Sequence, residues 1–264
     1  MVDDGSLPAG YIPILMPAYD RPEYLAQVLK ALERADGMQS TVLIVSQDGD
    51  NARVAAMLDA VTAFRVVRLS HWRPYLGGLP RLFLSHSDFA TADNVRWLLR
   101  FAFESLRARN AIVLESDIRP STDFYRFFQW MAAEIEGNAT LRERVWTVNG
   151  YNMRSRRGAD PYTLSPFGFT VWGWLCPGST WPDIRDGWTW FHNWDIQVEA
   201  ARRASGRASL TPALSRMRNI GMQGINFDVR SAADAAKWEA VWTSEVGVPY
   251  WGKAPVVTEQ WARA

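Results

Sequence analysis

Short β-rich runs alternate with helical periodicity through the first half of the sequence. We expect strands at residues 12–16, 42–45, 64–69 and 111–114. Between these runs, apolar residues recur at the spacing of one helix face, as at Leu25, Leu29 and Leu32. Strands joined by crossover helices form a mainly parallel sheet with helices on both faces. The sequence therefore predicts an α/β fold whose ligands bind beyond the carboxyl ends of the strands.

The second half of the sequence follows without a linker, repeat or low-complexity tract. We expect strands at residues 145–148 and 170–175 and a helix at residues 194–204. Thr122 is expected to cap a helix whose apolar face includes Phe124 and Phe128. Because no boundary separates the halves, we interpret residues 1–264 as a single domain.

Composition limits the classes of partner. The 264 residues are 48% hydrophobic, which is enough for a substantial core. The 29 basic and 28 acidic residues give a formal charge of +1, which supplies no overall attraction for nucleic acid or anionic lipid. No apolar stretch approaches the roughly 18 residues of a membrane-spanning helix, so we expect no membrane span.

The cysteine count and the first residues bear on the compartment. The single cysteine, Cys176, excludes an internal disulfide, and we interpret it as a buried, inert thiol. Asp3 and Asp4 stand where a secretory signal would carry positive charge. We therefore expect a soluble, cytoplasmic protein.

Carboxylates follow three of the expected strands. Glu115-Ser116-Asp117 comes directly after the run at residues 111–114, Ser46-Gln47-Asp48 follows the second strand, and Asp20-Arg21 follows the first. Asp117 offers oxygen to a hard divalent cation, whose remaining positions take diphosphate oxygens and water. The alternative is a solvated acidic loop, which the tripeptide alone favours. His71, His86 and His192 lack metal-ligand spacing, and we assign them no catalytic role.

A series of motifs carries a resemblance to a known family. In chain order they are Val42–Asp48, Arg96-Trp97-Leu98, Glu115-Ser116-Asp117, Gly173-Trp174-Leu175 and Trp194-Asp195. Taken together, they resemble the N-acetylglucosaminyltransferase I family of GT-A-fold glycosyltransferases and its bacterial relatives. The resemblance covers about residues 12–226, which is most of the chain.

The resemblance implies a GT-A fold, a mainly parallel sheet flanked by helices with a C-terminal acceptor-side lobe. Residues from about 11 to 120 would form the nucleotide-sugar-binding half and residues from about 121 to 264 the acceptor-side half. It also implies a metal-dependent inverting transferase with Mn²⁺ or Mg²⁺ as cofactor. The donor would be a nucleotide sugar, with a GlcNAc-like UDP-sugar as the first expectation. The acceptor would be a hydroxyl group of a glycan, a protein, a metabolite or modified DNA.

The resemblance also assigns roles to individual residues. It implies that Asp117 binds the metal and that Asp195 is the catalytic base. The residues implied in donor binding are Arg21, Asp48, Asn94, Glu115, Ser116, Trp174, Trp194 and Gln223. Ordinary structural roles remain open for several of them: a turn for Asp48, a solvated cation for Arg21, and core packing for the two tryptophans.

The sequence departs from the family at three positions. Ser116 replaces the central acid of the triplet, and Asn94 and Gln223 stand at or near positions where the family has histidines. These departures indicate that the donor pocket accepts a different sugar or nucleotide. Glycines in the segment 218–224 would let backbone N–H groups approach a diphosphate.

Three other functions remain open. A glycosyltransferase of hydroxylated DNA bases would use two basic clusters, Arg154, Arg156, Arg157 and Arg202, Arg203, Arg207, although the near-neutral total charge favours a solvated surface for them. A sugar-nucleotide nucleotidyltransferase would share the sheet and the acidic metal site, but the segment 17–22 lacks the Gly-rich basic loop of such enzymes. A non-catalytic nucleotide-sugar-binding module would keep the fold without turnover.

Overall fold

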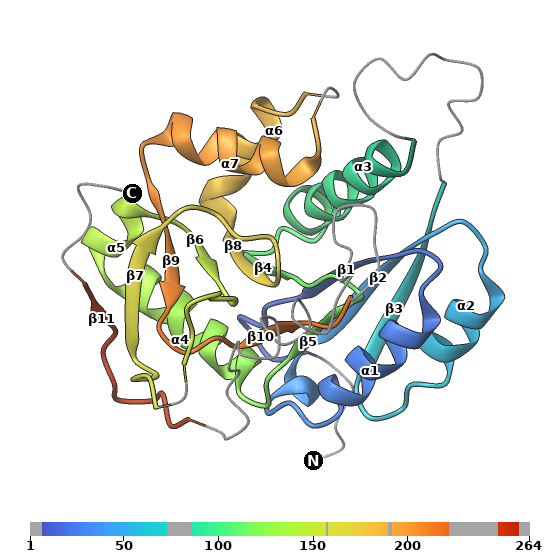
Figure 1. The fold of residues 1–264 in the computed structure, drawn as a ribbon, viewed down its shortest axis with the longest axis horizontal. Helices are drawn as coiled ribbons and strands as arrows, with labels where there is room; N and C mark the ends of the chain where they lie inside the picture. Colours follow the sequence, from blue (N-terminus) through green and yellow to red (C-terminus); the bar gives the residue numbers. More distant parts are fainter. Residues whose placement is uncertain (1–6, 73–85, 157, 190–191, 222–247, 259–264) are drawn as a thin grey trace.

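A nine-stranded mixed sheet forms the centre of the protein (Figure 1). The computed structural model describes residues 7–72, 86–156, 158–189, 192–221 and 248–258. The strands of this sheet are β1 (Ile14–Ala18), β2 (Val42–Asp48), β3 (Arg65–His71), β4 (Asn110–Val113), β6 (Val145–Asn149), β7 (Thr163–Phe167), β8 (Trp174–Pro177), β9 (Ala208–Pro212) and β11 (Val256–Val257). Their spatial order is β11-β7-β9-β6-β8-β4-β1-β2-β3.

Within the nine-stranded sheet, β1, β2, β3 and β4 are all parallel to one another, as the sequence predicts. β1 pairs in parallel with β2 and β4, and β2 pairs in parallel with β3. The second half is mixed, because β8 is antiparallel to both β4 and β6, and β7 is antiparallel to β9. The predicted α/β fold with a mainly parallel sheet is confirmed.

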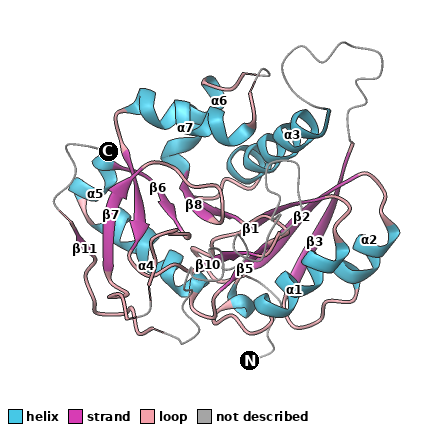
Figure 2. Cartoon of the chain, in the orientation of Figure 1, coloured by secondary structure: helices cyan, strands magenta, loops and turns pink. Residues whose placement is uncertain are grey.

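Helices cover both faces of the sheet (Figure 2). They are α1 (Pro22–Leu32), α2 (Ala52–Asp59), α3 (His86–Arg100), α4 (Phe124–Gly137), α5 (Ala139–Arg144), α6 (Trp181–Asp186) and α7 (Trp194–Ser205). Short helical turns lie at η1 (Met38–Ser40), η2 (Phe101–Ser105) and η3 (Gly178–Thr180). Side chains of α1, α2 and α4 pack in one apolar cluster, and those of α3, α6 and α7 pack in a second.

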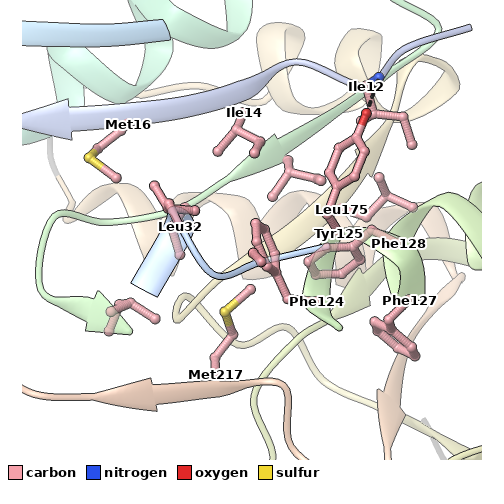
Figure 3. Packing of buried hydrophobic residues seen from close by; sticks show 14 of the residues in the cluster. Ile12, Ile14, Met16, Leu32, Phe124, Tyr125, Phe127, Phe128, Leu175 and Met217 are labelled. Carbon is pink, nitrogen blue, oxygen red and sulfur yellow. Dashed lines mark hydrogen bonds between the residues drawn. The ribbon is translucent and has the colours of Figure 1, made fainter. Parts of the chain in front are cut away.

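Alternating side chains of the central strands divide the core into these two clusters. In β1, Ile14 and Met16 face the cluster of α1 and α4, whereas Leu15 faces the cluster of α3. Figure 3 shows Ile14 and Met16 above the aromatic residues of α4, where the Tyr125 hydroxyl accepts a hydrogen bond from the Ile12 amide at 3.2 Å. Burial on both faces fixes the strands whose carboxyl ends hold the candidate site.

Two details of the prediction are wrong. The expected strand at residues 170–175 begins only at Trp174, because the segment before it turns at Gly173, which has a φ of 74°. Thr122 does not cap α4, since the helix begins at Phe124 with Asp123 as its N-cap residue. The Asp123 carboxylate makes no cap hydrogen bond, because it binds Ser121, Arg216 and Tyr250 instead.

A two-stranded sheet brings a late part of the chain to the end of β4. β5 (Ile118–Pro120) pairs antiparallel with β10 (Met217–Asn219). The Ile220 amide continues this ladder by donating to the Asp117 carbonyl at 3.0 Å. The segment that follows β10 therefore lies against Asp117.

In the described ranges, we find no helix with both the length and the apolar character that crossing a bilayer demands.

Candidate active site

A cavity of about 630 Å³ opens where β1, β2 and β4 end. This is the edge at which ligands bind in parallel α/β sheets. Eight of the residues singled out from the sequence line it, namely Arg21, Asp48, Asn94, Glu115, Ser116, Asp117, Trp194 and Asp195. The cavity thus brings together residues from both halves of the chain.

Asp117 lies on the loop between β4 and β5, and its carboxylate contacts Arg21. Arg21 stands at the start of α1, directly after β1, and its Nη1 donates to Asp117 Oδ2 at 3.0 Å. Burial raises the pKa of Asp117, and the Arg21 charge and hydrogen bond partly offset this effect. Arg21 therefore supplies a positive charge to a carboxylate in a mostly buried position.

Glu115 adds a second carboxyl group to the same electrostatic environment. Burial raises the pKa of Glu115 well above its ordinary value, and the negative charges of Asp117 and Asp195 raise it further. The charges of Asp117 and Asp195 thus act on Glu115 across the cavity. Additional positive charge, such as a cation, would relieve this repulsion.

Gly221 lies directly against the Asp117 carboxylate. A Cβ on Gly221 would overlap Asp117 Oδ2 and would lie 3.0 Å from its Cγ. The Gly221 amide donates to Asn219 Oδ1 at 2.8 Å, which fixes the turn after β10. Only a residue without a side chain fits this approach.

Asp195 lines the cavity from α7, in the C-terminal half of the chain. It is the second residue of α7, after the N-cap residue Asn193. Asp195 also lines a second cavity, of about 410 Å³, together with Phe169, Ile196 and Glu199 among others. Of the residues that the structure describes, Asp195 and Val171 line both cavities.

Asp48 and Asn94 line the first cavity from β2 and α3. Asp48 is the last residue of β2 and is 2% exposed. Its Oδ1 lies 2.5 Å from His71 Nδ1, and His71 is its register partner at the end of β3. Asn94 of α3 donates from Nδ2 to the Ser46 carbonyl at 3.1 Å.

Sequence reasoning missed His71. The histidines of the sequence lack metal-ligand spacing, and the predicted third strand ends at residue 69, whereas β3 continues to His71. Matching the carboxyl ends of the two adjacent parallel strands would have paired His71 with Asp48.

Trp174 and Trp194, the two tryptophans predicted to bind the donor, lie in different surroundings. Trp194 lines the cavity, whereas Trp174 has an exposed fraction of 0% and does not line it. The Trp174 ring packs on Trp194 at a centroid distance of 6.5 Å and on Phe169 at 4.9 Å. This placement favours core packing for Trp174. Trp172, which sequence reasoning missed, lines the cavity instead.

The remaining predictions concern Gln223, Cys176 and the basic clusters. Gln223 lies outside the described residues. Cys176 is a free, buried thiol, and burial raises its pKa, as an inert thiol requires.

The second basic cluster is ion-paired. Arg202 and Arg203 donate to the Glu199 carboxylate at 2.8 Å each, and Arg207 binds Asp183. Arg202 also donates to the Arg207 carbonyl at 2.8 Å. Glu199 and Asp183 therefore already balance part of the positive charge of this second cluster. Arg157 of the first cluster lies outside the described residues.

Comparison with known proteins agrees with the resemblance. The chain is 23% identical over 229 residues to an alpha-1,3-mannosyl-glycoprotein 2-beta-N-acetylglucosaminyltransferase of Arabidopsis thaliana, covering 85% of this chain and 50% of that protein. The chain thus spans about half the length of this curated relative. The fold is similar to a crystal structure of residues 1–349 of TarS from S. aureus, with a TM-score of 0.50, 12% identity, and coverage of 86% of this chain and 69% of that one.

The family model described as the GNT-I family matches residues 4–228, which is most of the sequence. The match includes every described residue of the cavity wall discussed above. The chain belongs to the GNT-I family.

Proposed function

We propose that the protein is a metal-dependent, inverting glycosyltransferase that moves a sugar from a UDP-sugar to a hydroxyl acceptor. The observation that carries this proposal is that Asp117 and Asp195 line one cavity at the carboxyl ends of the strands. Because the Arabidopsis relative is named an N-acetylglucosaminyltransferase, UDP-GlcNAc is the first donor to test.

The cavity residues are compatible with a metal shared between protein and donor. In the part of the chain that the structure describes, no three His, Cys, Asp or Glu side chains form a metal cluster. Asp117 would therefore hold Mn²⁺ or Mg²⁺ through a single carboxylate, and Mg²⁺ commonly binds through few carboxylates together with substrate phosphates. When bound, such an ion supplies charge stabilisation for the departing diphosphate.

The protein side chains divide the reaction between them. In an inverting transfer, the acceptor oxygen forms a bond to the anomeric carbon while the bond from that carbon to the diphosphate oxygen breaks on the opposite face. Asp195 takes the acceptor proton, and a positioned general base of this kind is worth on the order of 10²–10⁴-fold. Arg21 donates to the diphosphate as negative charge accumulates there, which needs its guanidinium to turn from Asp117.

The second cavity is the proposed acceptor side. A general base must lie within hydrogen-bond reach of the acceptor hydroxyl while the donor occupies the other side. Asp195 meets this requirement because it lines both cavities. Apolar Phe169, Val171 and Ile196 line the second cavity and would contact the C–H face of a sugar ring.

A donor panel tests the proposal. Purified protein is mixed with UDP-GlcNAc, UDP-glucose, UDP-galactose or GDP-mannose, with and without Mn²⁺, and thermal stabilisation and released nucleotide are measured. We expect metal-dependent stabilisation and slow hydrolysis with at least one UDP-sugar. Asp186→Asn is the control for variants of the cavity acids Asp117 and Asp195, because Asp186 is an exposed acid that pairs with Arg185 outside the cavity. Metal-dependent binding without hydrolysis or transfer would instead support a non-catalytic binding module.

A further inference from the structure

A buried cluster of one histidine and two carboxylates lies next to the donor cavity. His71 Nδ1 is 2.5 Å from Asp48 Oδ1, and His71 Nε2 is 3.3 Å from Asp93 Oδ2. The side chains of His71 and Asp48 are 6% and 3% exposed, and that of Asp93 is 32% exposed. The cluster joins the ends of β2 and β3 to α3.

The geometry identifies the protonation state of the ring. A neutral imidazole carries one N–H group, so it donates to one carboxylate and turns a lone pair toward the other. An imidazolium donates from both nitrogens and satisfies both carboxylates. Since each ring nitrogen of His71 faces a carboxylate oxygen, the doubly protonated ring fits this arrangement.

The direction of the pKa shift of His71 agrees with a doubly protonated ring. Burial lowers the pKa of His71, but hydrogen bonds and charge from Asp48 and Asp93 outweigh burial and raise the pKa to about 9. Trp97 of α3 packs on the ring at a centroid distance of 5.8 Å and adds no charge. Among the described residues, the charged groups that determine this balance are therefore Asp48 from β2 and Asp93 from α3.

We propose that His71, as an imidazolium held between Asp48 and Asp93, is a positioning residue that fixes the Asp48 carboxylate in the wall of the donor cavity. This inference rests on the proposed function, because it takes the cavity as the nucleotide site. His71 does not line the cavity and acts through Asp48. Its carbonyl also accepts a hydrogen bond from the Gly49 amide at 3.2 Å, which holds the backbone directly after Asp48.

Loss of the His71 proton would disturb donor binding in two ways. With one N–H left between two carboxylates, Asp48 and Asp93 compete for a single hydrogen bond from the ring, so the ring holds the Asp48 carboxylate less firmly. The cluster also becomes one unit more negative beside the site of an anionic nucleotide. UDP affinity should therefore fall as pH rises through the pKa of the ring, and below that pKa it should be constant with respect to this group.

Calorimetric titration of UDP in the presence of Mg²⁺, from about pH 6 to about pH 10, tests the proposal. The proteins compared are wild type, His71→Gln and Asp93→Asn, all without a histidine tag. Asparagine still accepts a hydrogen bond from Nε2–H but removes one negative charge from the ring. We expect the alkaline midpoint of Asp93→Asn to lie roughly one pH unit below that of wild type. We expect His71→Gln to bind UDP about tenfold more weakly near neutral pH.

The comparison between variants separates the effect of the protein from that of the ligand. UDP loses its uracil imide proton at the alkaline end of the range, and this contribution is the same for all three proteins. A purely structural histidine would change the melting temperature without moving the midpoint of UDP affinity. If His71→Gln does not fold, the alkaline midpoint of UDP affinity in Asp93→Asn tests the proposal by itself.

The outcomes separate this inference from the proposed function. UDP binding with a lower midpoint in Asp93→Asn supports the positioning role. UDP binding with coincident wild-type and Asp93→Asn profiles overturns that role and leaves the donor site intact. Absence of UDP binding by wild type at every pH overturns both.

Discussion

Gly221 lies so close to the Asp117 carboxylate that a Cβ would overlap Oδ2. The two residues are more than a hundred positions apart, and the pairing of β5 with β10 brings them together. The close approach ties the turn after β10 to the residue that we propose as the metal ligand.

Gly221→Ala should therefore reduce donor turnover at least tenfold, because either Asp117 or the turn must shift by several tenths of an ångström. Turnover of UDP-sugar and the melting temperature would both be measured. Gly137→Ala is the matched control, since a Cβ on Gly137 at the end of α4 meets no atom within 4 Å. Equal turnover in the two variants would show that the contact is unimportant.

Ile196→Asp should separate hydrolysis from transfer. Ile196 is 54% exposed and lines the second cavity, where a carboxylate would oppose an apolar sugar face. We expect the acceptor KM to rise about tenfold or more with p-nitrophenyl glycosides, while hydrolysis of the donor stays within about twofold. Val256→Asp, an exposed apolar position on β11, is the control. A parallel loss of hydrolysis and transfer would place Ile196 in the donor site instead.

Arg216 and Tyr250 should be important for stability. Arg216 is fully buried, its Nε donates to Asp123 Oδ2 at 2.9 Å, and the Tyr250 hydroxyl donates to the same oxygen at 2.5 Å. Arg216→Met leaves Asp123 buried without its cationic partner and should cost about 3–5 kcal/mol. Tyr250→Phe removes a hydrogen bond to a charged group and should cost about 1.5–3 kcal/mol. Urea unfolding measures both, and a cost below about 0.5 kcal/mol for Arg216→Met would contradict this role.

His71 should make the free energy of unfolding depend on pH. Its folded-state pKa of about 9 lies above the ordinary value of 6.5, so its contribution is fully present below pH 6.5 and is lost as pH rises to about 9. The total is on the order of 3 kcal/mol. Urea unfolding of wild type and His71→Gln across this range measures the difference, which should shrink toward high pH. A difference that is constant with pH would show that folding does not raise the pKa of the ring.

The sequence was informative where periodicity is local. β1, β2 and β4 are apolar runs buried on both faces, and they end at the acids that the sequence singled out. β9 was not predicted, because its buried Ser209 and Thr211 break the apolar pattern. Ser209 and Thr211 instead make side-chain hydrogen bonds to Thr147 and Asn149 of β6, a pairing that composition does not reveal.

The candidate site was predictable only in part, because some of its residues come together through contacts between distant parts of the chain. Strand ends placed Asp48 and Asp117, and the family resemblance supplied Asp195. The roles of His71 and Gly221 depend on long-range contacts, the first on strand register and the second on the pairing of β5 with β10. The sequence does not distinguish the roles of Trp174 and Trp194. Only the packing shows that Trp174 is fully buried and that Trp194 lines the cavity.

The central claim is that Asp117 and Asp195 serve the same transfer in different roles, the first by holding the metal at the donor diphosphate and the second by taking the acceptor proton. Calorimetry with UDP and Mn²⁺, together with turnover of UDP-sugar, tests it in Asp117→Asn and Asp195→Asn. The account predicts that Asp117→Asn loses metal-dependent binding, whereas Asp195→Asn binds UDP as wild type does and loses about 10²–10⁴-fold in turnover. Wild-type binding and turnover in both variants would contradict it.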